Sequence, residues 1–171
     1  ITIDEKNFEV FTISAGQHAA IIRNEAFTGS GIEATVLFDE SSRYALEVTA
    51  DQADINKLLG FSDCSQRYQS SSARIGWRWF DDELQLFAYA YKDGDLTFEL
   101  MGAAPLNSEV DLMINRTATS YEFSGTGLKA VSLERTSDCE VSENYWLWPY
   151  FGGNQVAPQD ITIRLKREQI D

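Results

Sequence analysis

The sequence contains few of the residues on which metal sites and membrane anchors depend. It has one histidine, His18, two cysteines and three prolines in 171 residues. A single histidine excludes metal sites built on two or more histidines, and no Cys-x-x-Cys occurs. No apolar run approaches the roughly 18 residues that span a bilayer. We therefore expect neither a zinc role nor a transmembrane segment.

Positive charge is also scarce. The chain has 14 Lys and Arg against 27 Asp and Glu, a net charge of -13. Nucleic acid and anionic membrane surfaces would repel such a protein, so neither is an expected partner. Apolar residues make up 43% and aromatics 12%, which indicates a globular core rather than a disordered chain. The length predicts one domain, residues 1–171.

The apolar pattern has period two between frequent turn signals. Candidate strands include "HAAIIRN", "RYALEV", "ARIGWRWF", "LQLFAYAYK" and "YWLWPYF". Many short strands with almost no helical period predict an all-β fold, an antiparallel two-sheet sandwich of the jelly-roll type. The one helical turn that we expect is "DINKLLG", with Asp54 as its cap and Gly60 as its stop.

Two hairpins fix which side chains share a face of the sheet. The Asp93-Gly94 turn pairs Tyr89 with Phe98. For the preceding "DDE" turn we pair Phe80 with Leu84. Alternation along the strands then predicts a core face with Ile75, Trp77, Trp79, Phe87, Tyr89, Tyr91, Leu96, Phe98 and Leu100.

The opposite face carries the first candidate binding residues, Arg74, Arg78 and Glu99. They stand over small residues such as Ala88 and Ala90, a floor that suits a polar ligand. The guanidinium group of an arginine donates paired hydrogen bonds to hydroxyl groups or carboxylates, and a glutamate accepts hydrogen bonds. The alternative is a solvated face with cross-strand Arg-Glu pairs.

The segment "YWLWPYFGG" supplies the second candidate set. If Tyr145, Leu147 and Phe151 point inward, an outward platform for sugar rings remains, formed by Trp146, Trp148 and Tyr150. Pro149 predicts a bend there. Under the alternative, a loop covers this part of the sheet.

Cys64 and Cys139 lie in polar Ser-Asp-Cys contexts, which predicts one disulfide closing a long loop. A disulfide favours a secreted, periplasmic or cell-surface location, whereas two separate thiols would fit the cytosol. We expect no cofactor. Calcium stays open because the acidic segments 81–83 and 93–95 supply oxygens, although hairpin turns explain both.

Two short motifs resemble those of polysaccharide-degrading enzymes. "EVDLMI" resembles the E-x-D-x-E strand of laminarinase-type glycoside hydrolases, with Met113 in place of the acid/base glutamate. "YFGGNQ" resembles a strand of jelly-roll polysaccharide lyases, which use a Tyr or His base and groups that neutralise a uronate. Residues of those types are Arg74, Arg78, Tyr68, His18 and Gln155.

Residues 73–168 resemble the concanavalin A-like (laminin G-like) sandwich at the level of strand pattern. The segments that carry this resemblance are "EVDLMINRTATSYEFSGTGLKAV" and "YWLWPYFGGNQVAPQDITIRLK". The combination of "INKLLGFSDC", "SSARIGWRW" and "YFGGN" also resembles small uncharacterised secreted or lipid-anchored sandwich proteins of polysaccharide-degrading bacteria. The resemblance implies an extracytoplasmic, glycan-related setting.

Three functions follow as hypotheses. The first is a secreted sandwich that recognises a polysaccharide or oligosaccharide without cleaving it. The second is a polysaccharide lyase acting on uronates, with the arginines neutralising the carboxylate. The third is a structural or adhesive module that binds another protein.

Overall fold

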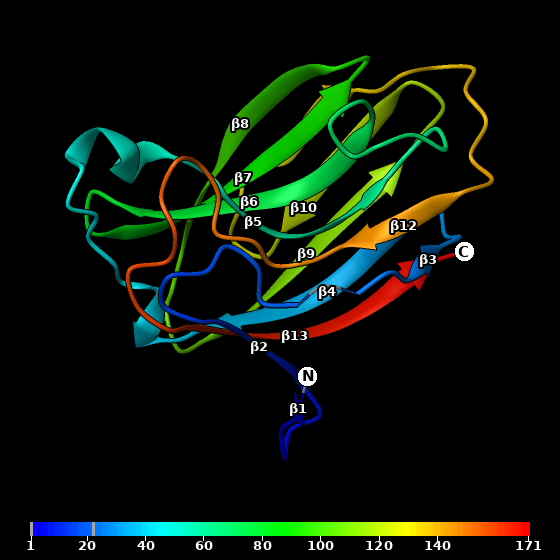
Figure 1. Ribbon diagram of the computed structural model, residues 1–171. Coiled ribbons are helices and arrows are strands. Elements are labelled where there is room, and N and C mark those ends of the chain that lie inside the picture. Colours follow the sequence, from blue (N-terminus) through cyan, green and yellow to red (C-terminus); the bar gives the residue numbers. More distant parts are fainter. Residues whose placement is uncertain (1, 22) are drawn as a thin grey trace.

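The protein is a sandwich of two antiparallel sheets in the computed structural model, which describes residues 2–21 and 23–171 (Figure 1). The seven-stranded sheet has the order β1 (Thr2–Ile3), β2 (Glu9–Ile13), β13 (Ile161–Ile170), β4 (Gly31–Phe38), β9 (Glu109–Arg116), β10 (Ser120–Gly125) and β11 (Val131–Glu134). The six-stranded sheet has the order β3 (Ala26–Phe27), β12 (Asn144–Leu147), β5 (Asn56–Ser62), β6 (Ser72–Phe80), β7 (Glu83–Lys92) and β8 (Asp95–Ala104). The prediction of an all-β, jelly-roll sandwich is confirmed.

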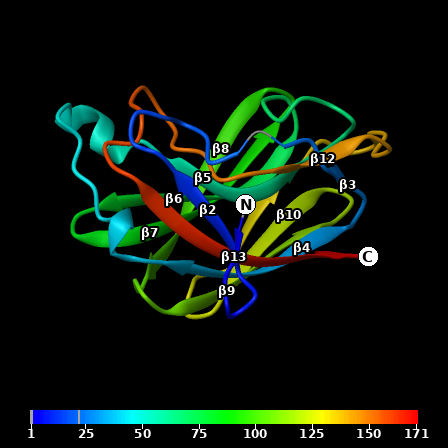
Figure 2. The ribbon, with the colours of Figure 1, turned by 60° about the horizontal axis from the view of Figure 1, so that its bottom comes forward.

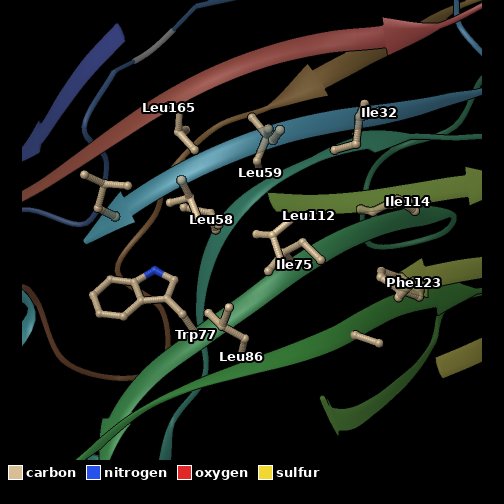
Figure 3. Close-up of a cluster of buried hydrophobic side chains, with 14 of the residues drawn as sticks. Ile32, Leu58, Leu59, Ile75, Trp77, Leu86, Leu112, Ile114, Phe123 and Leu165 are labelled. Carbon is tan, nitrogen blue, oxygen red and sulfur yellow. The ribbon is translucent and has the colours of Figure 1, made fainter. Parts of the chain in front are cut away.

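Apolar side chains from both sheets fill the space between them. Trp77, Ile75 and Leu86 point inward from the six-stranded sheet and meet side chains such as Leu112 and Ile114 from the other sheet (Figure 3). Trp77 is fully buried. This packing removes apolar surface from water, at roughly 25 cal/mol per Å², and holds the two sheets together.

The expected helical turn at residues 54–60 is wrong, because residues 56–60 belong to β5 (Asn56–Ser62). The strand bulges between Lys57 and Leu59, so Leu58 and Leu59 both reach the core. In the sequence, the two adjacent leucines give this segment an apolar spacing that resembles that of a helix. Two short 3-10 turns, η1 (Glu40–Ser42) and η2 (Thr49–Ala53), lie elsewhere, and no helix in the described ranges is long and apolar enough to cross a membrane.

Two expected strands are absent from the described part of the chain. Residues 43–48 of "RYALEV" form a connection between η1 and η2. The described part of "HAAIIRN" contributes only one isolated bridge, between Ala19 and Tyr150. Figures 1 and 2 show this segment (blue) beside the one that follows β12 (orange). Both segments run next to the six-stranded sheet, where they position the groove described below.

The first hairpin register is confirmed and the second is wrong by one residue. Tyr89 pairs with Phe98, as the Asp93-Gly94 turn predicts. In the other hairpin Phe80 pairs with Glu83, because Asp81 and Asp82 alone form the turn, both with positive φ. A one-residue slip turns every side chain of a strand to the other face. Leu84, Leu86, Ala88 and Ala90 therefore face the core with Trp77, and Phe87, Tyr89 and Tyr91 lie on the outer face.

Candidate functional site

A groove of about 550 Å³ lies on the outer face of the six-stranded sheet. Its floor comes from β5, β6 and β7, and its walls come from the β2–β3 segment, the β5–β6 loop and residues 145–150. The lining residues are Ala19, Ile21, Arg23, Asn24, Lys57, Tyr68, Gln69, Arg74, Tyr89, Tyr91, Tyr145, Trp146, Leu147, Trp148, Pro149 and Tyr150. Three of them are cationic and none carries a carboxylate. In a chain with a net charge of -13, the groove is therefore lined by positive side chains without a negative one among its lining residues.

Arg74 stands at the centre of the groove floor. The strand pairings place it in one cross-sheet row, Leu147, Gly60, Arg74, Tyr89 and Phe98. Its side chain extends over Gly60, where a Cβ atom would lie 2.7 Å from Arg74 Cγ. The glycine therefore provides the space that the guanidinium needs.

The Arg74 guanidinium is only partly satisfied. Nη2 donates to the carbonyl oxygen of Trp148 at 3.0 Å, and the buried Nε has no hydrogen-bond partner among the described residues. Arg74 is 7% exposed, and burial lowers its pKa to about 10, so it stays charged at neutral pH. A buried charge without a counter-ion is costly, and an anionic ligand would remove that cost.

Lys57 lies beside Arg74 on the groove floor. Its Nζ donates to the carbonyl oxygen of Ile55 at 2.7 Å and lies 4.9 Å from the centre of the Tyr89 ring. Burial, reinforced by the charge of Arg74, lowers the pKa of Lys57 to about 8, and Asp54 opposes this shift. Within the described chain, no carboxylate is within ion-pair distance of either Lys57 or Arg74.

Arg23, the third cation, is already neutralised. It forms ion pairs with Glu25 at 2.6 Å and with Glu9 at 3.6 Å, and its guanidinium lies over the Trp148 ring. The charge available to a ligand is therefore that of Arg74 and Lys57.

Tyrosines surround the two free cations. Tyr68 and Tyr145 are linked, since the Tyr68 backbone N–H donates to the Tyr145 hydroxyl at 3.1 Å. Tyr150 stacks on His18, with ring centroids 5.2 Å apart. Burial and the neighbouring Tyr91 raise the pKa of Tyr89, so its hydroxyl stays neutral. Phenol groups of this kind donate hydrogen bonds to sugar hydroxyls and present flat faces to sugar rings.

The structure separates the three residues of the first candidate set. Arg74 lines the groove, but Arg78 lies outside it, donating to Gln85 Oε1 at 2.8 Å and to the Ala53 carbonyl at 2.7 Å. Glu99 points to the opposite face of the sheet and pairs with Lys129. The expected grouping of Glu99 with Arg74 is wrong. In this part of β8 the odd-numbered side chains point to the face of the sheet opposite to Arg74.

The expected aromatic platform is also wrong. Trp146 and Trp148 belong to the core cluster, with 4% and 8% exposure, and stack on each other. Arg167 covers both indole rings. Trp146 pairs with the core residue Phe61, and this parity turns Tyr145 and Leu147 outward instead. Only Tyr150 is exposed as expected, at 38%.

The remaining motif residues lie away from the groove. Glu109 and Asp111 are on the outer face of the seven-stranded sheet, where Asp111 accepts from Thr35 Oγ1 at 2.7 Å. Gln155 donates to Asp51 at 2.7 Å, outside the groove. The hydrolase-like motif and this groove are therefore on different sheets.

A buried ion network supports the loop that carries Tyr68. Asp63 is fully buried and accepts from Arg116 at 2.9 Å, from Arg135 at 2.8 Å and from the Tyr121 hydroxyl at 2.7 Å. The next residue, Cys64, forms a disulfide with Cys139, as the sequence predicted. The first end of the loop is thus fixed by a covalent bond and by several charge-assisted hydrogen bonds.

Sequence reasoning missed Lys57 and Asp63. Lys57 was assigned to a helical turn, so its position on the floor beside Arg74 was lost. The signal that identifies it is the run "NKLLGFS", whose last four residues alternate apolar with small, as in a strand. No local signal exists for Asp63, because its partners lie more than 50 residues away in the sequence.

Comparisons with known proteins identify the fold. No protein-family model matches the sequence, and no curated protein matches it. Among solved structures, an alginate lyase from Klebsiella pneumoniae superposes with a TM-score of 0.65 at 10% identity, covering 98% of this chain and 83% of that chain.

Glycanases of a second class share the architecture. A GH16 protein of the Bacteroides ovatus mixed linkage glucan system superposes with a TM-score of 0.62 at 8% identity, covering 98% of this chain and 82% of that one. A non-specific endo-beta-1,3(4)-glucanase from family GH16 gives 0.62 at 8% identity, with 95% and 71% covered. The chain therefore shares its two-sheet sandwich fold with an alginate lyase and with GH16 proteins.

Proposed function

We propose that this protein is a carbohydrate-recognition sandwich that binds uronate-containing polysaccharide in the groove of the six-stranded sheet. The observation that carries the proposal is the pair Arg74 and Lys57, a buried and a half-buried cation without a carboxylate partner in the described chain. A uronate is a sugar with one carboxylate. It supplies the missing counter-ion together with hydroxyl groups for the surrounding tyrosines.

The bound carboxylate would lie between the two cations. Arg74 and Lys57 both line the groove, the Arg74 Nε has no hydrogen-bond partner, and the Lys57 ammonium donates only to the Ile55 carbonyl oxygen among the described residues. A charge-assisted hydrogen bond contributes about 1.5–3 kcal/mol, which corresponds to about 10- to 150-fold in affinity. A neutral glycan would lack this contribution and would leave both charges without a counter-ion.

The fold and the disulfide both fit a protein that meets polysaccharides outside the cytoplasm. The structural neighbours are named as an alginate lyase and as glucanases, so proteins with this architecture act on polysaccharides. The Cys64–Cys139 bond persists in oxidising compartments, which fits a secreted or cell-surface protein that meets extracellular glycans.

The test is retention on immobilised polysaccharides, comparing uronate-rich polymers with neutral glucans. We expect retention only on the uronates, and its loss in Arg74→Met, which keeps the apolar stem of the side chain. Arg78→Met is the matched control, since Arg78 is on the same strand and is satisfied outside the groove. Equal retention of both variants on uronates would remove Arg74 from the site.

Catalysis is a second candidate, favoured by the lowered pKa of Lys57. A lyase breaks the C5–H bond and the C4–O bond of a uronate and forms a C4=C5 double bond. The proton on C5 goes to a base and another proton goes to the leaving oxygen. An amine with a pKa of about 8 is partly neutral at mildly alkaline pH and can serve as that base, with Arg74 neutralising the carboxylate.

Ultraviolet absorbance separates the two candidates, because the elimination product contains a new conjugated double bond. Incubation with alginate, pectin and glucuronan at mildly alkaline pH would show rising absorbance for a lyase. A constant absorbance on every uronate that the protein retains assigns it to binding alone.

A further inference from the structure

Three apolar side chains on the edge strand β8 remain exposed on the same face as the groove. Leu96, Phe98 and Leu100 are 41%, 51% and 44% exposed. Large apolar residues at this exposure are ordinary when single, but a contiguous row on one strand marks a contact surface. They lie beyond the groove lining, on the side away from β12.

Phe98 continues the cross-sheet row that contains Arg74. It pairs with Tyr89, which pairs with Arg74. Its ring stacks on Tyr89, with centroids 6.3 Å apart and planes at 16°, and meets Phe87 edge-on at 6.2 Å. The neighbouring rings therefore hold Phe98 in a fixed orientation, and half of its surface remains free for a ligand.

We propose that Phe98 is a sugar-stacking subsite of the groove, which makes recognition depend on the length of the uronate chain. This inference rests on the proposed function. Neighbouring strands are about 4.8 Å apart, so β8 lies about 10 Å from β6, the span of about two linked sugar rings. A chain whose carboxylate binds Arg74 and Lys57 reaches Phe98 with the ring two units further along.

The chemistry of the face favours a sugar over a second protein. Along this face the side chains change from cations, Lys57 on β5 and Arg74 on β6, to aromatic rings on β7 and β8, which matches a ligand with carboxylates and apolar C–H faces. Continuity with the cationic groove therefore selects the glycan as the occupant.

The experiment measures the affinities of uronate di-, tri- and tetrasaccharides by calorimetry. In the wild type, we expect the trisaccharide to bind about three- to tenfold more tightly than the disaccharide. Phe98→Leu keeps an apolar side chain but removes the ring, so this increment should vanish while disaccharide affinity stays unchanged. Phe98→Trp should retain it. Ile3→Ala, at an exposed apolar position of the other sheet, should match the wild type.

The outcomes distinguish this inference from the function on which it rests. If the wild type binds uronates with no gain from disaccharide to trisaccharide, or if Phe98→Leu keeps the gain, the subsite is wrong and the groove proposal stands. If the wild type binds no uronate of any length, both proposals fail. If Phe98→Leu instead converts a dimer into a monomer in sedimentation without changing affinity, the face belongs to a second copy.

Discussion

Arg74 donates a hydrogen bond to the carbonyl oxygen of Trp148 across the intervening strand β5. The contact directs the guanidinium over Gly60 and along the groove floor. It also joins the centre of the sheet to the segment that forms one groove wall. The orientation of the charge therefore depends on the absence of a side chain at Gly60.

Gly60→Ala should displace Arg74 and weaken uronate binding by about tenfold or more. A Cβ atom at this position would lie 2.0 Å from the Ala73 carbonyl oxygen and 2.7 Å from Arg74 Cα and Cγ, so the arginine and its strand must shift. Calorimetric titration with a uronate oligosaccharide measures the loss.

The matched control is Gly31→Ala in the seven-stranded sheet. A Cβ atom there would meet the Ile114 carbonyl oxygen at 2.3 Å, so the backbone conflict is similar but distant from the groove. We expect both variants to lower the unfolding temperature and only Gly60→Ala to lower affinity. Equal affinity losses would mean that general destabilisation, rather than the position of Arg74, explains the effect.

Binding should weaken as the pH rises through about 8. The pKa of Lys57 is lowered to about 8 by burial and by Arg74, with Asp54 opposing, so its amine is charged below that pH and neutral above it. The raised pKa of Tyr89 keeps that neighbour uncharged throughout this range. A carboxylate ligand requires the charged amine, so affinity is highest below pH 8. Titrations across this pH range measure the decline.

Lys57→Arg tests whether Lys57 causes that decline. A guanidinium stays charged across the whole range, so the variant should show a nearly flat pH profile. A wild-type profile that is flat, or a decline that persists unchanged in Lys57→Arg, would contradict the assignment.

Asp63→Asn should destabilise the fold by about 3–5 kcal/mol, because it leaves the Arg116 and Arg135 charges buried without their counter-ion. Urea unfolding gives the difference in the free energy of unfolding. Asp111→Asn, at an exposed carboxylate that accepts one hydrogen bond, is the control and should change stability by less than about 1 kcal/mol. Similar values for the two variants would show that the Asp63 network contributes little.

The fold was predictable because its signals are local. Alternating apolar residues and strong turns such as Asp93-Gly94 specify strands and their pairing without long-range information. Where a turn was ambiguous, as at residues 81–83, the choice between two and three turn residues decided which face every side chain of β7 occupies. That single slip placed Tyr89 and Tyr91, two of the tyrosines that line the groove, in the predicted core.

The site was only partly predictable because it depends on pairings between distant strands. Arg74 was identified from its own strand, and its outward direction is confirmed. Its partner Lys57 comes from a bulged strand, and the walls come from segments near residues 20, 68 and 148. Trp146 and Trp148 face inward because β12 pairs with β5, a relationship that no local pattern contains.

The most direct measurement compares one uronate trisaccharide with its carboxyl-reduced counterpart, which differs only in having neutral hydroxymethyl groups. If the groove cations select the carboxylate, calorimetry will show binding of the acid and a loss of at least about tenfold for the reduced sugar. Equal affinity for the two sugars would contradict the account, since the unpaired charges of Arg74 and Lys57 would then play no part in recognition.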